Sequence, residues 1–179
     1  MQQFKGCVTI ILVTKILILV AILVFIFFTG NSLAQSSPSV KYDLPYPGIL
    51  PDHPLYKLKV LRDKIATFLI SDPTKKAQYH LLLADKRLVM ARMLVDKDMI
   101  ELAKETALKG ENEYTLLVFM YKDINKKPSK PLFNKLEKAA MKHQELLNEI
   151  VKKVSEKDKG TFRTVLGFSK RNLLELKSL

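Results

Sequence analysis

The sequence predicts an all-α protein, an antiparallel bundle of four to five helices preceded by an N-terminal apolar helix and a proline-rich tether. Three observations support this prediction. Apolar residues beyond residue 52 recur at spacings of three and four, the period of one helix face. No stretch alternates apolar and polar residues for long, and β-branched residues are sparse, which disfavours strands. Proline, glycine and polar clusters separate the periodic segments, as turns between helices do.

Composition narrows the class of protein. The chain has 179 residues, with 30 basic and 18 acidic side chains and a formal net charge of +12. Its length supports one compact domain. The single cysteine excludes an internal disulfide framework and a cysteine-rich zinc site. A charged fraction of 27% excludes a polytopic membrane protein.

Residues 1–34 form the first predicted region, an export segment. Val8–Phe28 is almost wholly apolar and is interrupted by one charged residue, Lys15. Small residues behind the apolar run predict a signal peptide cleaved after Ala34. An uncleaved anchor over residues 8–29 is the alternative, because about 20 apolar residues span a bilayer. Both interpretations place Lys5 and Lys15 at the inner side of the membrane and the rest of the chain at its outer side.

Residues 35–51 are the second region and residues 52–179 the third. The second is rich in serine, proline and tyrosine, which predicts an extended tether that ends against the domain. The third is predicted to be the bundle, with Asp52 and Asp72 as helix caps that precede proline. Its helices are expected at about 52–70, 73–96, 98–124 and 132–154, and from 161 onward.

Each expected helix carries one apolar stripe. In the first helix the stripe is Leu55, Leu58, Leu61, Ile65, Phe68 and Leu69. In the second it is Ala77, Leu81, Ala84, Leu88, Ala91 and Val95. The fourth has the most regular spacing, with Leu136, Ala140, His143, Leu147, Ile150 and Val154. Gly110 weakens the third helix by about 1 kcal/mol relative to alanine, so a break there fits the pattern.

His143 occupies a position where an apolar residue is expected. A metal ligand or proton-sensitive switch is the functional interpretation. A structural imidazole bonded to a carbonyl or carboxylate is the alternative, and the one we expect, because its helix has no second histidine or cysteine at ligand spacing. If the ring is buried and neutral, the stability of the protein falls as pH drops below about 6.5. If the ring is paired with a carboxylate, the stability of the protein falls as pH rises through the elevated pKa of the ring.

Arg62, Asp85 and Arg87 lie beside the stripes of the first two helices. An ion-pair network between helices is the expected arrangement, and anion recognition by the two arginines is the alternative. The sequence contains no glycine-rich phosphate loop, GxSxG elbow or HExxH motif. We therefore predict no enzyme activity, catalytic residue, metal site or cofactor.

The basic excess indicates anionic partners. Much of the excess is expected on solvated helix faces. The cluster Lys126, Lys127 and Lys130 and a second cluster within 152–159 could share one end of the bundle. Outside the membrane, such a patch would meet anionic lipid headgroups or envelope polymers. Aromatic residues are scarce there, which disfavours sequence-specific binding of nucleic acid.

Several short motifs match a known pattern. They are Leu44–Pro51, the Pro54-Leu55-Tyr56 helix start, then Ala77, Leu81, Ala84, Arg87 and Leu88, and later Lys142-His143. On these residues the chain resembles domain-of-unknown-function family 5667, a family of bacterial proteins, most specifically over residues 42–90. The resemblance implies an extracytoplasmic helical domain behind an N-terminal signal or membrane segment. It implies no activity, because the family has none to transfer.

These observations lead to one functional hypothesis and one alternative. The hypothesis is a non-enzymatic, membrane-tethered or secreted helical module of the bacterial cell envelope, with a structural or interaction role and a protein partner that the sequence does not identify. The membrane would be reached through the N-terminal apolar segment. The alternative is a periplasmic-type metal or stress sensor, or a ligand-binding helical protein, centred on His143.

Overall fold

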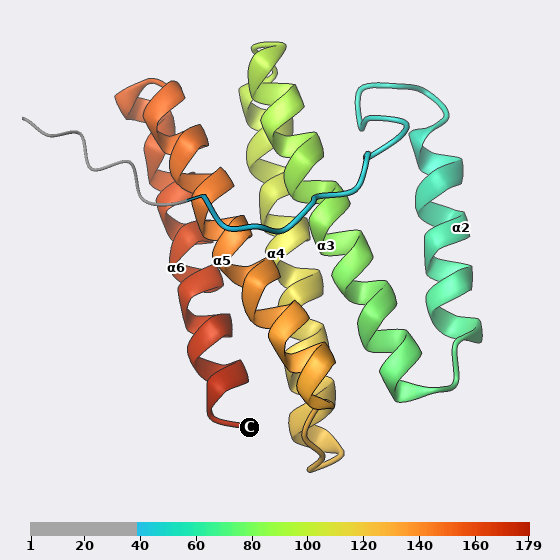
Figure 1. Ribbon diagram of the computed structural model, residues 1–179. Coiled ribbons are helices and arrows are strands. Elements are labelled where there is room, and N and C mark those ends of the chain that lie inside the picture. Colours follow the sequence, from blue (N-terminus) through green and yellow to red (C-terminus); the bar gives the residue numbers. More distant parts are fainter. Residues whose placement is uncertain (1–38) are drawn as a thin grey trace, which may run out of the picture. The chain divides into compact units, whose positions relative to one another are not determined.

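The computed structural model describes residues 39–179 (Figure 1). No strand occurs within these residues, and the all-α bundle is confirmed. None of their helices is long and apolar enough to span a membrane. The leader predictions concern residues that lie outside this range. The elements are α2 (Tyr56–Leu69), α3 (Pro73–Asp96), α4 (Ile100–Asp123), α5 (Lys130–Lys153), a short 3₁₀ turn η1 (Glu156–Asp158) and α6 (Lys159–Lys177).

Helices α3 to α6 form the bundle. Short loops connect consecutive helices, which therefore run antiparallel (Figure 1). Helix α3 packs on α4 and α5, and α6 packs on the same two helices. Helix α2 lies outside this group of four and packs only lightly on α3. The bundle core is therefore built by four of the five helices.

The helix ends show which predicted caps operate. Asp72 caps α3 as expected, since its carboxylate accepts a hydrogen bond from the Lys75 N–H at 2.6 Å. Asp52 does not cap α2, which begins only at Tyr56; its carboxylate instead pairs with Lys97 at 2.7 Å. Asp98 has φ 59° and lies in the turn before α4 rather than at the first position of that helix.

Helix α4 is continuous through Gly110, without the break that the low helix propensity of glycine allowed. A Cβ atom at this position would lie 3.2 Å from Cγ of Leu88 on α3, closer than an ordinary carbon contact. The missing side chain therefore lets α3 and α4 approach closely, which compensates for the low helix propensity of glycine.

The bundle core consists of two apolar clusters. The first contains Leu88, Val89, Ala91, Leu94, Val95, Ala103, Ala107, Leu146, Leu147, Ile150, Val154, Phe162, Val165 and Leu166. The second contains Ala77, Leu81, Ala84, Tyr114, Leu117, Val118, Tyr121, Leu132, Leu136, Ala139, Ala140 and Leu176. Along α3, α4 and α5 the two clusters are separated by one buried polar residue, and along α6 they are separated by two, Ser169 and Asn172. We call four of these residues, Asp85, Glu111, His143 and Asn172, the polar layer.

The apolar stripe of α2 faces solvent, contrary to the expectation that it packs in the bundle. Its members, here called the α2 apolar face, are Leu55, Leu58, Leu61, Ile65, Phe68 and Leu69, all exposed. Phe68 is 85% exposed. The opposite side of α2 carries Asp63, which is buried and accepts a hydrogen bond from Tyr79 of α3 at 3.4 Å. Periodicity identifies an apolar stripe but not the surface that covers it.

The segment before α2 lies along the bundle instead of only ending against it. Residues 39–50 run as an extended chain across the helices (Figure 1). The Val40 N–H donates to Glu145 of α5 at 3.0 Å, and the Tyr42 hydroxyl donates to Asp85 of α3 at 2.6 Å. Leu44 packs against the first apolar cluster. The C-terminal end of the tether is therefore part of the folded domain.

Candidate functional site

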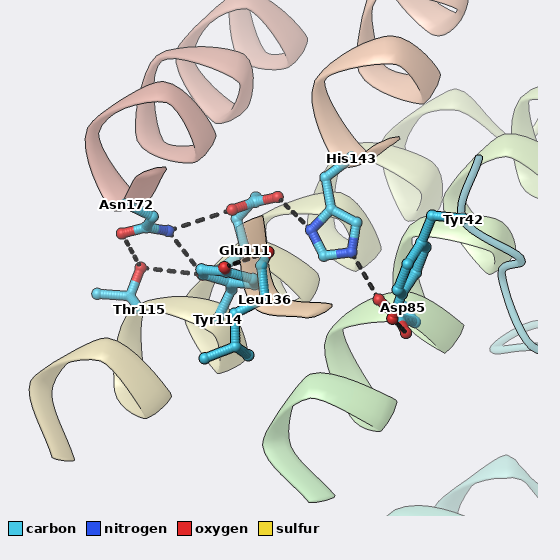
Figure 2. A network of polar contacts seen from close by, with 8 residues as sticks. All are labelled: Tyr42, Asp85, Glu111, Tyr114, Thr115, Leu136, His143 and Asn172. Carbon is cyan, nitrogen blue, oxygen red and sulfur yellow. Dashed lines mark hydrogen bonds and ion pairs between the residues drawn. The ribbon is translucent and has the colours of Figure 1, made fainter. Parts of the chain in front are cut away.

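The polar layer is the candidate functional site, because it gathers ionisable groups in an otherwise apolar core. Asp85 comes from α3, Glu111 from α4, His143 from α5 and Asn172 from α6, and all four are buried (Figure 2). Each occupies an inward position at spacings of three and four from apolar neighbours on its own helix. The regular pattern that buries leucine and alanine elsewhere thus also buries these polar side chains.

His143 is the centre of the layer, with 0% of its surface exposed. Its Nε2 lies 2.8 Å from Oδ1 of Asp85, and its Nδ1 lies 3.0 Å from Oε1 of Glu111. The ring therefore bridges α3 and α4 from α5 (Figure 2). The edge of the Tyr114 ring packs against it, with ring centroids 5.6 Å apart. A ring that donates to carboxylates on both sides carries two N–H groups, which is the imidazolium form.

Both carboxylates have further donors. The Tyr42 hydroxyl donates to Oδ2 of Asp85, and the amide nitrogen of Asn172 donates to Oε2 of Glu111 at 3.2 Å. Thr115 in turn donates to the Asn172 carbonyl at 3.1 Å. The network thus connects the four bundle helices and the extended segment (Figure 2). A buried carboxylate needs hydrogen-bond donors of this kind, because burial removes it from water.

The surroundings of His143 stabilise its cationic form. Burial alone lowers the pKa of His143, but hydrogen bonds and charge from Asp85 and Glu111 outweigh burial and raise that pKa from 6.5 to about 9. Burial beside Asp85 raises the pKa of Tyr42, so its hydroxyl stays a donor. The layer is therefore a cation held between two carboxylates at neutral pH.

This arrangement predicts a stability loss on the alkaline side. Because the folded pKa of His143 exceeds the unfolded value, its contribution is complete below pH 6.5 and is lost as pH rises through about 9. The shift corresponds to roughly 3 kcal/mol of unfolding free energy. We expect urea midpoints of residues 35–179 to fall steadily between pH 6.5 and 9.5, as followed by circular dichroism.

A variant whose polar layer has lost its charged groups is the control for this pH dependence. Burial of Lys59, beside the carbonyl of Pro47, lowers the pKa of that lysine to about 8 and acts with the opposite sign above this pH. The combined variant Asp85→Asn, Glu111→Gln and His143→Leu keeps Lys59 and removes the layer's charges. The difference between the two pH curves isolates the layer, and parallel curves would contradict the assignment of a cationic His143.

The geometry of the layer bears on the metal hypothesis. The two carboxylates lie on opposite edges of the imidazole, so their oxygens and the ring nitrogens do not converge on one point. Within the range 39–179, no group of three or more His, Cys, Asp and Glu side chains is arranged to hold a metal ion. The arrangement instead places one cationic ring between carboxylates on two other helices.

The other predicted site residues do not join this layer. Arg62 pairs with its sequence neighbour Asp63 at 2.7 Å and is mostly exposed. Arg87 pairs with Glu113 of α4, which also accepts from His80. Arg62, Asp85 and Arg87 do not pair with one another, because the three side chains have different partners. Asp85 and Arg87 do each make an ion pair between helices.

The two lysine clusters do not meet either. Lys126, Lys127 and Lys130 lie at the start of α5, whereas residues 152–159 lie beyond or at its end. A helix of 24 residues separates them by about 36 Å. The prediction that they share one end of the bundle is wrong, because α5 runs the full length between the two loops.

Sequence reasoning missed Glu111, Thr115 and Asn172 as members of the network, and it did not predict the hydrogen bond from Tyr42 to Asp85. Glu111 lies four residues after Ala107, and Asn172 lies four residues before Leu176, so both are polar residues at seam spacing. That signal was available. Tyr42 reaches Asp85 through a contact 43 residues apart in the chain, and nothing in the local sequence encodes it.

Comparison with known proteins gives a family without an assigned activity. No curated protein matches the chain, and no solved structure does. One family model matches residues 48–157, which include α2 to α5 and three of the four polar-layer residues. Since this match covers more than half of the chain, the protein belongs to the family described as "Domain of unknown function (DUF5667)".

Proposed function

We propose that this protein is a non-enzymatic interaction module of the cell envelope, held at the outer side of the plasma membrane or secreted. The observation that carries the proposal is the α2 apolar face. Six large apolar side chains, that of Leu55 just before α2 and those of five residues on it, are exposed at helical spacing. A contiguous apolar surface of this kind is typical of a contact with another molecule. The location rests on the apolar run of residues 8–28, with Lys5 before it and Lys15 within it.

The polar layer supports a structural role for the bundle itself. Its central ring is fully enclosed, and the carboxylates are occupied by donors from the protein. Buried polar residues at matching levels favour one helix register over others, which is the best-attested use of such groups. The metal-sensor alternative gains no support from this geometry, because both ring nitrogens of His143 face carboxylates.

The location can be tested by cysteine labelling. Lys127 is exposed in the α4–α5 loop, and Cys7 is the only native cysteine. In a Cys7→Ser background, we expect Lys127→Cys to react with a membrane-impermeant maleimide in intact spheroplasts. The label should appear either on the membrane fraction or, after cleavage, on released protein.

The unmodified chain is the matched control for this labelling. Its Cys7 precedes the apolar run, so we expect the impermeant reagent to leave it unlabelled until the membrane is opened. Protection of Lys127→Cys in intact spheroplasts, with reaction only after lysis, would place the bundle inside and end the proposed location.

A further inference from the structure

We infer that α2 is an interfacial helix whose apolar face and basic borders bind an anionic lipid bilayer surface. This inference rests on the proposed function and names the partner of its contact surface. The occupant is the boundary between headgroups and acyl chains, into which an amphipathic helix lowers its apolar side chains. Two features of the described residues and one of the sequence favour this occupant.

The first feature is the direction of the α2 apolar face. Asp63 and Thr67 lie on the side of α2 that is turned toward α3. The apolar face is turned away from that side except at Phe68, which borders the groove between α2 and α3. Phe68 is 85% exposed and Leu58 is 64% exposed. A helix bound at an interface presents this arrangement, with its polar side kept on the protein and its apolar side free to enter lipid.

The second feature is the placement of charge. At 3.6 residues per turn, Lys57 and Lys64 lie along one edge of the α2 apolar face, and Lys59 and Arg62 lie along the other. The one acidic residue of α2, Asp63, is buried on the bundle side. Lys57 and Lys64 are exposed and can extend to anionic headgroups while the apolar face beside them is buried. On the other edge, Lys59 donates to the Pro47 carbonyl and Arg62 pairs with Asp63.

The third feature is the distance along the chain to the apolar run. Residues 29–54 separate Phe28 from Leu55, and the described part of this stretch already lies along the bundle. With the run in a bilayer, α2 stays within about 90 Å of the same surface even if these 26 residues are fully extended. Such confinement raises the effective concentration of the bilayer surface at α2.

The same features argue against a second copy of the chain as the occupant. A symmetric contact between two α2 helices would bring their basic edges together, and each helix offers four basic residues against one acidic residue. Like charges at a contact oppose association. An anionic bilayer instead pairs with these edges.

The absence of tryptophan from the sequence makes a site-specific test direct. The full chain carrying Phe68→Trp is added to preformed vesicles of phosphatidylglycerol and phosphatidylcholine. We expect its emission to shift to shorter wavelength and to lose intensity when the acyl chains are brominated, because α2 enters the bilayer. The probe reports on α2 alone, so insertion of the leader does not produce the signal.

Leu174→Trp is the matched control. Leu174 is 69% exposed on α6, which packs on α4 and α5 rather than beside α2. We expect this probe to show neither the shift nor the quenching. Equal signals from both positions, or a Phe68→Trp emission that vesicles do not change, would overturn the inference. A shift without lipid that grows with protein concentration would overturn it in favour of a second copy.

The basic borders have their own test. The double change Lys57→Gln and Lys64→Gln should weaken docking of α2 by roughly 25-fold, since each lysine near an anionic surface contributes about fivefold. Lys126→Gln with Lys127→Gln, in the α4–α5 loop, should leave docking unchanged. Equal docking of the two variants, or equal docking to phosphatidylcholine alone, would overturn the role of anionic lipid. Maleimide labelling tests the proposed location separately, and its failure would leave this vesicle result intact.

Discussion

Replacement of His143 by leucine is expected to lower the free energy of unfolding by about 3–5 kcal/mol at pH 7. The substitution leaves Asp85 and Glu111 buried without the cation that both of them contact. An uncompensated buried charge is among the most destabilising changes known for a folded domain. Urea unfolding of residues 35–179, followed by circular dichroism, measures the loss.

Two further variants distinguish the contribution of the buried ion pairs to stability from that of side-chain packing. Exchanging Asp85, Glu111 and His143 together for leucine removes every charge of the layer, so we expect much of the stability to return. Lys109→Leu breaks an exposed pair with Glu105 and should change stability by less than about 1 kcal/mol. A loss below 1 kcal/mol for His143→Leu alone would show that the layer does not hold the charges described.

Leu81→Asp is expected to be comparably severe, and it tests the apolar core instead of the polar layer. Leu81 is 1% exposed in the second apolar cluster. Aspartate there is buried among apolar side chains, with no cation among the residues of that cluster. We expect loss of the cooperative unfolding transition, or a fall of more than about 4 kcal/mol, by circular dichroism.

Leu58→Asp is the matched control for this change. Leu58 belongs to the same kind of apolar stripe in the sequence, but it is 64% exposed on α2. The same substitution should therefore change stability by no more than about 0.5 kcal/mol. A severe loss for Leu58→Asp would mean that the α2 apolar face packs on the bundle in solution, which would contradict the structure.

The local signals of the sequence predicted the bundle well. Leu81 and Leu147 lie on stripes that the structure buries, because a helix with one apolar face must cover it when a neighbouring helix offers another. The Asp72 cap with its following proline begins α3 as expected, since that geometry depends on residues within one turn. Short polar joints then dictate antiparallel neighbours.

The level of the polar layer is also readable from the sequence, although we did not predict it. Asp85 lies 13 residues before Asp98 in the α3–α4 turn, and Glu111 lies 13 residues after it. Antiparallel helices of equal rise therefore bring these two residues to one height in the bundle. His143 lies about as many residues after the α4–α5 loop as Glu111 lies before it. The arithmetic predicts their meeting but not the bonds they form.

By itself, the sequence determined the helices, their apolar stripes and the place of His143 on one of them, because these depend on a period that each segment carries alone. Only the tertiary structure decided that the imidazole lies between Asp85 and Glu111, and hence that it is a cation whose loss of a proton opposes folding. Only the tertiary structure decided that the stripe containing Phe68 faces solvent. Both outcomes depend on partners distant in the chain, and a helical period contains no information about which surface, if any, will cover it.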